Sequence, residues 1–229
     1  MLLRKFANLP CEMQNEVVRG YYDLLIPKQA EFFVKRVLDF LLALLLLILT
    51  LPLMLIISMV VRSDSPGGAL FCQTRRMRYN KEFVIYKFRT MSMDCPSGGS
   101  VTTRNDPRVT RIGKFLRSSH LDELPQLFNV LRGELSFVGP RPEVPYFVAR
   151  YDEAMLATLL IPAGITSPAT LLFANEADLL DGTESERIYI DLLMPRKASL
   201  NLDYLCEFSL LGDLRIMALT TLRIFFSRS

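Results

Sequence analysis

The chain has 229 residues, with 27 lysines and arginines against 24 aspartates and glutamates and a net charge of +3 at neutral pH. This length accommodates a membrane segment plus one domain of about 150 residues, and the small net charge indicates no bulk affinity for polyanions. The single histidine, His120, excludes His-rich zinc sites. The four cysteines form no C-x-x-C pair, which is typical of reduced thiols in a cytosolic domain.

A long apolar run dominates the N-terminal third of the chain. Residues 1–34 are predicted to form a short amphipathic lead-in, and residues 40–61 are uncharged and almost wholly apolar. At 1.5 Å per residue, this run of about 22 residues could cross a hydrocarbon core of roughly 30 Å. It begins too late for a cleavable signal peptide. We therefore predict three parts: the lead-in, a membrane segment at residues 35–61, and a cytosolic domain at residues 62–229, lying at the membrane surface.

Pro52 lies inside the apolar run and is predicted to break its helix. It removes one backbone donor and so frees the carbonyl of Ile48, which in lipid needs another partner. Thr50 is the nearest side chain that could supply one. Basic residues stand at both ends of the run, so they lack the asymmetry that fixes a simple crossing. A re-entrant helix with both ends in the cytosol accounts for them better than a full span, which stays open as the alternative.

The remaining chain predicts a helix-dominated α+β fold with a short β-hairpin. After a turn cluster at residues 63–68, two strands are expected at residues 69–73 and 82–89, joined by a basic turn, and a loop follows at residues 94–107. Helical periodicity covers residues 109–131, with an interruption near Pro125. Further helices are expected at residues 146–160, 184–193 and 210–226. The last could pack on the core, which we expect, or lie on the membrane surface.

The adjacent acids Asp122 and Glu123 are the sharpest candidates for chemistry. Proline is tolerated in the first turn of a helix, so Pro125 predicts a helix that begins at or just after Asp122. Asp122 could then be an N-cap and Glu123 a first-turn acid. The same placement would keep a carboxylate ionised and bring backbone donors to a phosphate. An ionised carboxylate can be a nucleophile toward phosphorus or a ligand for Mg²⁺, so both interpretations stay open here.

Basic side chains are dense around this acidic pair. Lys87 and Arg89 point to the same face of an extended strand, and Arg141 stands between two prolines, a stiff mount for bidentate phosphate contact. A basic stripe follows if its segment is helical: Arg108, Arg111, Lys114 and Arg117. Each of these alone is typical of a solvated surface charge. Their density around one acidic pair favours a substrate that carries a diphosphate.

The order of these motifs strongly resembles the bacterial sugar transferases, the monotopic phosphoglycosyl transferases that start surface-glycan assembly. The resemblance covers residues 32–145 well and the remainder loosely. It rests on Lys35-Arg36 with Asp39, Pro52, YKFRTM at 86–91, DPRVTRIGKFLR at 106–117, LDELPQLFNVLRGELSFVGPRPE at 121–143 and GIT at 164–166. The run at 121–143 is the most specific of these.

The resemblance implies a re-entrant membrane helix and a small catalytic domain at the cytoplasmic face of the bacterial inner membrane. It implies transfer of a sugar phosphate from a UDP-sugar to polyprenol (undecaprenyl) phosphate, with release of UMP, as the first step of exopolysaccharide, capsule or O-antigen assembly. Asp122 would attack the sugar-proximal phosphate and form a covalent phosphosugar intermediate, which the polyprenol phosphate then resolves. Glu123 would help to hold Mg²⁺.

We expect four basic residues to bind substrate phosphate: Lys87, Arg89, Arg117 and Arg141. Arg117 and Arg141 match positions that the family uses for phosphate, and Lys87 matches the lysine of its KFRT motif.

The chain departs from the family pattern at three places. Leu51 precedes Pro52 where serine is usual, and His120 stands two residues before the acidic pair where serine is common. Residues 161–167 lack the arginine and the last glycine of the motif Arg-Pro-Gly-Ile-Thr-Gly.

A silent scaffold and a nucleic-acid binder are the alternatives to an enzyme. A catalytically silent membrane-anchored scaffold on the same fold would have no reason to retain the acidic pair together with Lys87 and Arg141. A nucleic-acid binder is not expected, because no array of base-stacking aromatic residues accompanies the basic stripe. A homo-oligomer stays open.

Overall fold

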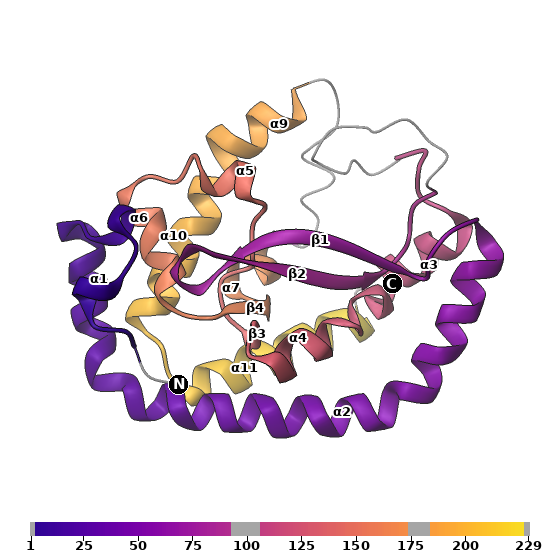
Figure 1. Ribbon diagram of the computed structural model, residues 1–229, viewed down its shortest axis with the longest axis horizontal. Coiled ribbons are helices and arrows are strands. Elements are labelled where there is room, and N and C mark those ends of the chain that lie inside the picture. The colour runs from indigo at the N-terminus through magenta and orange to yellow at the C-terminus, as the bar shows by residue number, and fades with distance from the viewer. Residues whose placement is uncertain (1–2, 93–105, 174–183, 227–229) are drawn as a thin grey trace.

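The computed structural model describes residues 3–92, 106–173 and 184–226, and every structural statement here concerns those residues. They form a helix-dominated fold with two small sheets of two strands each, as the sequence predicts. The predicted loop at residues 94–107 lies almost wholly outside them. The hairpin and the shorter helices stack above one long helix, α2, which runs along the bottom of the view (Figure 1).

The N-terminal lead-in is part of the core. Two 3₁₀ turns, Phe6–Asn8 and Cys11–Met13, precede helix α1, Glu16–Leu25, and a third, Ile26–Lys28, follows it. The side chain of Asn15 caps α1 by accepting a hydrogen bond from the backbone of Val18 at 2.8 Å. Val18 and Leu25 are fully buried in the largest apolar cluster of the described residues.

Helix α2, Gln29–Asp64, is continuous through Pro52, so the predicted break is wrong. The helix runs straight and then bends upward toward its C-terminal end (Figure 1). Proline causes such bends because it lacks the amide proton and crowds the preceding turn. Thr50 does not serve the carbonyl of Ile48 as expected: its hydroxyl donates to the carbonyl of Leu46 at 2.7 Å, the back-bonding that threonine makes within helices.

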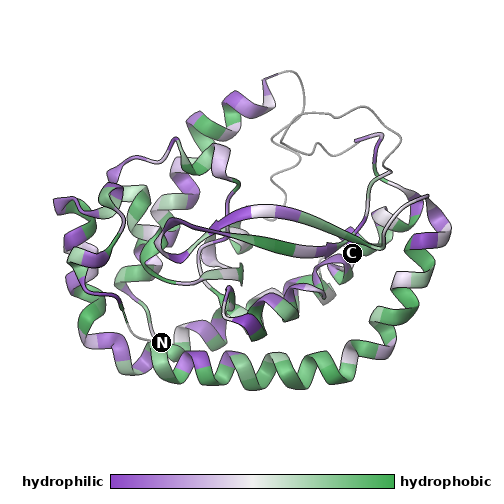
Figure 2. Cartoon of the chain, viewed as in Figure 1, coloured by the Kyte–Doolittle hydropathy of each residue, from purple (hydrophilic) through white to green (hydrophobic). Residues whose placement is uncertain are grey.

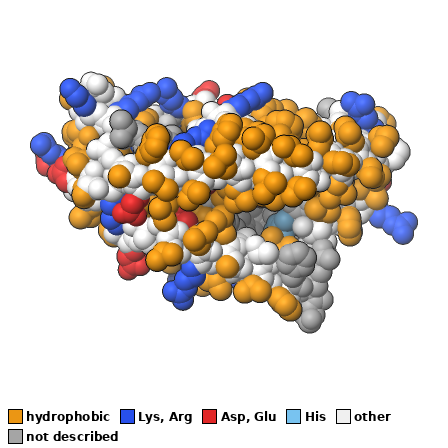
Figure 3. Space-filling view, turned by 90° about the horizontal axis from the view of Figure 1, so that it is seen from below, with side chains coloured by type: hydrophobic (Ala, Val, Ile, Leu, Met, Phe, Trp, Pro, Cys, Tyr) orange, Lys and Arg blue, Asp and Glu red, His pale blue; other side chains and the backbone are white. Residues whose placement is uncertain are grey.

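The apolar part of α2 is largely exposed. Within the described residues it forms the one stretch long and apolar enough to cross a membrane, and Figure 2 shows it almost uniformly hydrophobic. Seen from below, its side chains form a nearly unbroken hydrophobic band (Figure 3). A band of this extent marks a surface that meets lipid or another apolar partner.

The predicted hairpin is confirmed with shifted bounds. Strands β1, Leu70–Met77, and β2, Lys81–Phe88, pair antiparallel. A tight turn at Arg78–Asn80 joins them, with Tyr79 and Asn80 at positive φ. The buried side chain of Asn129 bonds the backbone of β2 at Val84 and Tyr86, at 2.7 and 3.2 Å, and so fixes the hairpin against helix α4.

The helical stretch predicted at residues 109–131 consists of three pieces: helix α3, Arg111–Ser118, the 3₁₀ turn Leu121–Glu123, and helix α4, Gln126–Arg132. The chain turns between the first two at His120, whose φ of 55° is left-handed. Arg36 donates to the carbonyls of Val130 and Leu131 at 2.6 and 3.0 Å. It thereby satisfies the free end of α4.

The sequence does not predict the second sheet, in which β3, Leu135–Val138, pairs parallel with β4, Ala163–Thr166. Two glycines permit its close packing: a Cβ atom on Gly164 would lie 2.1 Å from the amide nitrogen of Gly139. Between these strands, the single helix predicted at residues 146–160 is replaced by α5, Pro145–Val148, α6, Glu153–Leu156, and the 3₁₀ helix Ala157–Leu160.

The C-terminal part is helical. It comprises α7, Pro168–Leu172, then α9, Ser185–Ile188, which continues through a π-helical turn, Tyr189–Leu193, into α10, Met194–Cys206. The helix predicted at residues 184–193 is therefore longer than expected. Helix α11, Leu210–Phe226, has its predicted bounds and contacts β3, β4 and α7. Its leucines Leu211, Leu214 and Leu222 are nevertheless exposed, so the structure does not decide between core packing and a membrane-facing surface.

A buried polar cluster joins α11 to α2 and β3. Lys35 Nζ lies 2.5 Å from Asp213 Oδ2, whose other oxygen accepts a hydrogen bond from Tyr204 at 2.6 Å. Asp39, one turn after Lys35, accepts a hydrogen bond from Ser136 at 2.7 Å. The Lys-Arg…Asp motif at residues 35–39 therefore fixes helix α2 to the rest of the domain.

Candidate active site

The acidic pair lies in the 3₁₀ turn between α3 and α4, not at the start of a helix. Asp122 is buried, with 8% of its surface exposed. Because α4 begins four residues later, at Gln126, and His120 holds the N-cap position of the 3₁₀ turn, the N-cap interpretation of Asp122 is wrong. Among the described residues, no side chain or backbone amide donates a hydrogen bond to its carboxylate.

The environment of Asp122 differs from the expected one. Burial raises the pKa of its carboxyl above the ordinary value, and the neighbouring charge of Glu123 adds to this, while Lys87 and Arg117 oppose it. No helix dipole keeps it ionised, contrary to the expectation from sequence. The result is a carboxylate that is poorly solvated when it is ionised.

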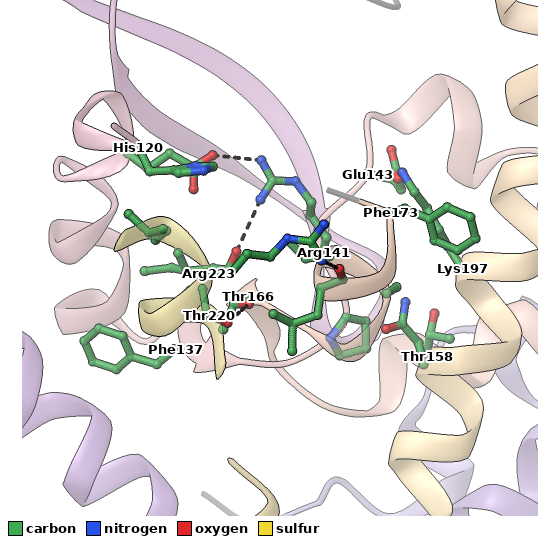
Figure 4. Close-up of a pocket in the computed structure, with 18 of the residues that line it drawn as sticks. His120, Phe137, Arg141, Glu143, Thr158, Thr166, Phe173, Lys197, Thr220 and Arg223 are labelled. Carbon is green, nitrogen blue, oxygen red and sulfur yellow. Dashed lines mark hydrogen bonds and ion pairs between the residues drawn. The ribbon is translucent and has the colours of Figure 1, made fainter. Parts of the chain in front are cut away.

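The environment of Glu123 has the opposite effect on the pKa of its carboxyl. Lys87 Nζ and Arg141 Nη2 both donate to its Oε1, at 2.7 and 2.8 Å. Although burial opposes its charge, these two cations hold the pKa of Glu123 well below its ordinary value. In Figure 4, Arg141 extends toward His120 from the opposite wall. Three of the predicted site residues are therefore in direct contact.

The other two predicted phosphate ligands differ from each other. Arg117 is half-buried and its Nε donates to Thr90 at 2.9 Å. Burial lowers its pKa, while the charge of Asp122 acts against this, so Arg117 lies within electrostatic reach of the acidic pair.

Arg89 does not belong to the site, and its assignment to phosphate is a correction. Its guanidinium donates to the carbonyls of Ser65 and Val61, at 2.7 and 3.4 Å, and to that of Pro66. The end of a long helix leaves carbonyls without partners, and Arg89 satisfies them where the hairpin meets the end of α2. The basic stripe is interrupted too, because Arg108 precedes α3 and pairs with Asp106 at 2.5 Å.

A cavity of about 520 Å³ is lined by Glu123 of the acidic pair and runs into the domain. Figure 4 shows His120 and Phe137 on one side of it and Glu143, Phe173, Lys197 and Thr158 on the other. The first side is largely apolar and includes residues of α2: its lining includes Leu46, Thr50, Leu124, Leu127 and Phe137. The same opening is visible from below, where the single histidine lies in a hollow beside the hydrophobic band (Figure 3).

The second side of the cavity carries polar side chains, none of which the sequence predicted as a site residue. Thr158 from the 3₁₀ helix Ala157–Leu160 and Asn201 from α10 line it, with Glu143, Tyr151 and Lys197. These residues are distant along the chain, and α10 itself lies beyond the helix predicted there. Only their shared place in the fold brings them together.

A magnesium ion at this site would have to take part of its ligands from a substrate. Within the described residues, no group of three or more histidine, cysteine or acidic side chains could hold a metal by itself. Mg²⁺ commonly binds one or two carboxylates together with substrate phosphates and water. Glu123, whose Oε1 accepts from Lys87 and Arg141, is the lining carboxylate that could ligate such an ion.

Comparison with known proteins gives concordant matches. A family model described as bacterial sugar transferase matches residues 30–227. The chain is 39% identical over 203 residues to an undecaprenyl-phosphate glucose phosphotransferase of Komagataeibacter xylinus, covering 85% of this chain and 36% of that protein. It is 37% identical over 190 residues to a UDP-N-acetylgalactosamine-undecaprenyl-phosphate N-acetylgalactosaminephosphotransferase of Aeromonas hydrophila, covering 80% and 44%.

A third relative is matched over more of its length. It is a UDP-glucose:undecaprenyl-phosphate glucose-1-phosphate transferase of Caulobacter vibrioides, 39% identical over 202 residues, which cover 85% of this chain and 71% of that protein. The chain thus spans between about a third and about two thirds of the length of these three relatives.

Proposed function

The chain belongs to the bacterial sugar transferase family, and on that premise we propose that it transfers a sugar phosphate from a UDP-sugar to undecaprenyl phosphate and releases UMP. The three relatives carry names for this reaction with glucose or N-acetylgalactosamine. The observation that supports it best is the buried carboxylate of Asp122 next to Glu123, which accepts hydrogen bonds from Lys87 and Arg141 and lines a cavity that extends to α2.

The first step is a displacement at phosphorus. An oxygen of Asp122 attacks the phosphorus next to the sugar, the bond from that phosphorus to the bridging oxygen breaks, and UMP leaves with the bonding electron pair. A buried carboxylate has less solvation to shed before it attacks than an exposed one, and this favours it as a nucleophile. The product is an aspartyl-phosphosugar.

The second step returns the enzyme to its starting state. A phosphate oxygen of undecaprenyl phosphate attacks the same phosphorus, the aspartyl oxygen leaves, and the Asp122 carboxylate is regenerated with a diphosphate-linked lipid sugar. Two anionic substrates thus use one site in turn, which avoids bringing them together. Lys87, Arg117 and Arg141 offset the negative charge of each phosphate.

Bound Mg²⁺ would add charge neutralisation of the diphosphate. Glu123 has a second role in this proposal, because it holds Lys87 and Arg141 in fixed positions beside Asp122. Their cationic groups are therefore already oriented before a substrate binds.

We place the reaction at the cytoplasmic face of the bacterial inner membrane, with α2 entering the bilayer as a re-entrant helix. The bend in α2, its exposed apolar side chains and the basic residues at both ends support this arrangement. The free thiols Cys11, Cys72 and Cys206 are exposed, as is typical of a reducing compartment.

The test is UMP release by the purified protein with a panel of UDP-hexoses and UDP-N-acetylhexosamines, with and without undecaprenyl phosphate. The proposal predicts turnover with at least one donor when the acceptor is present. No UMP release with any of them would favour the silent membrane-anchored scaffold.

A further inference from the structure

Asn201 has a side-chain oxygen without a hydrogen-bond donor in the described part of the chain, and it lines the cavity. Its side chain lines the polar side, 8% of its surface is exposed, and its carboxamide oxygen has no hydrogen-bond partner among the described residues. Buried polar atoms in folded proteins nearly always have partners, so an orphan at a cavity wall indicates a ligand group that completes it. That group must be a donor, because the free atom of Asn201 is an acceptor.

The neighbours of Asn201 suit a neutral, hydroxyl-bearing ligand. Thr158 is 5% exposed and its hydroxyl donates to the carbonyl of Met155 at 2.6 Å, so its oxygen can still accept. Lys197 lies one helical turn before Asn201 and therefore on the same face of α10. The nearby acid Glu143 is already engaged, because Tyr189 donates to its Oε1 and Arg75 lies 3.7 Å from its Oε2.

The two-step scheme assigns the polar side to the sugar. An in-line displacement requires the leaving and attacking groups to stand on opposite faces of the phosphorus. UMP therefore leaves from the face opposite Asp122, and the lipid phosphate must later attack from that same face. Only the sugar stays bound through both steps, so it alone suits an enclosed subsite. The lipid phosphate attacks only after UMP has left, from the face that UMP vacates.

We propose that Asn201 and Thr158 bind hydroxyl groups of the donor sugar and determine which UDP-sugar the protein uses. This inference rests on the proposed function and assigns the substrate contact within it.

The experiment measures kcat/KM for wild type, Asn201→Leu and Thr158→Val with a panel of UDP-sugars that includes epimers and single deoxy analogues. Both substitutions keep approximate side-chain volume and remove the hydrogen-bonding atoms. Ser199→Ala, at an exposed position two residues before Asn201 on α10, is the matched control. Thermal unfolding of each variant is measured in parallel, and Thr158→Val carries the test if Asn201→Leu does not fold.

We expect kcat/KM with the preferred donor to fall about threefold to tenfold in each variant, the worth of one neutral hydrogen bond. For each variant, kcat/KM with one deoxy analogue should equal that of wild type. This analogue lacks the hydroxyl that the substituted side chain would bind. Inhibition by UDP should be unchanged.

Two results would overturn the inference. An equal fall in kcat/KM with every UDP-sugar, together with weaker inhibition by UDP, would indicate that the polar side binds the nucleotide. Unchanged kcat/KM for all donors in both folded variants would leave the two side chains without a substrate contact. If wild type itself used no UDP-sugar, the proposed function would fail instead, so the two failures are distinguishable.

Discussion

Arg141→Ala tests the cationic clamp on the acidic pair. In the structure, Arg141 Nη2 lies 2.8 Å from Glu123 Oε1, and its Nη1 donates to the carbonyl of Ile165 at 3.2 Å. A hydrogen bond to a charged group contributes about 1.5–3 kcal/mol, which corresponds to about a tenfold to 150-fold change in rate. Because 38% of the Arg141 side chain is exposed, solvent screens part of this, and we expect the lower end, about tenfold to thirtyfold in kcat/KM.

The assay is UMP release with the preferred UDP-sugar and undecaprenyl phosphate. Arg150→Ala is the matched control, because Arg150 is an exposed arginine nearby that stacks on Tyr146 outside the cavity. It should retain full activity. Near-normal turnover of a well-folded Arg141→Ala would refute the role in phosphate binding and leave Arg141 as a structural partner of Glu123.

Three further predictions concern topology, stability and pH. Single cysteines at residues 30–34 and 64–68, in a background without native cysteines, should be labelled from the same side of the membrane; labelling from opposite sides would establish a single crossing. Asp213→Ala should lower the free energy of unfolding by about 1–3 kcal/mol, because the buried Lys35 and Tyr204 both lose a hydrogen-bond partner, whereas Arg187→Ala, at an exposed ion pair, should change it by less than about 1 kcal/mol; equal effects would contradict this. Because burial raises the pKa of Asp122, the UMP burst should begin to fall, as the pH is lowered, at a higher pH than an ordinary aspartate near 3.9 would give. The same raised pKa destabilises the fold at pH values above it, so Asp122→Asn should unfold at a higher temperature at neutral pH, and a lower one would contradict the assignment.

Sequence periodicity and turn residues predicted the elements that form from neighbouring residues. Helix α11 has its predicted bounds because its apolar periodicity is unbroken, and the hairpin follows from two strand-forming runs around a turn. The contact of Glu123 with Lys87 and Arg141 agrees with the density of charge around the acidic pair.

Features that depend on distant contacts were not predictable. Strands β3 and β4 have four residues each, too few to show an alternating pattern, and they pair across 24 intervening residues. Strand alternation put Arg89 on the face of Lys87, but the end of α2 lies against that end of the hairpin and supplies three carbonyls to its guanidinium. Helix α2 continues through Pro52 because a helix can continue past one missing donor when the neighbouring turns remain intact.

The central claim is that Asp122 carries the sugar phosphate covalently, and intact-protein mass spectrometry with peptide mapping tests it most directly. Purified protein incubated with the preferred UDP-sugar, without undecaprenyl phosphate, should release UMP up to about one equivalent and gain the mass of one phosphosugar on Asp122. Addition of undecaprenyl phosphate should remove the adduct, and Asp122→Asn should show neither burst nor adduct, because an amide is a far poorer nucleophile toward phosphorus. Synthesis of the lipid-linked product by Asp122→Asn at near wild-type rates would contradict the claim and require direct attack of the lipid phosphate on the UDP-sugar.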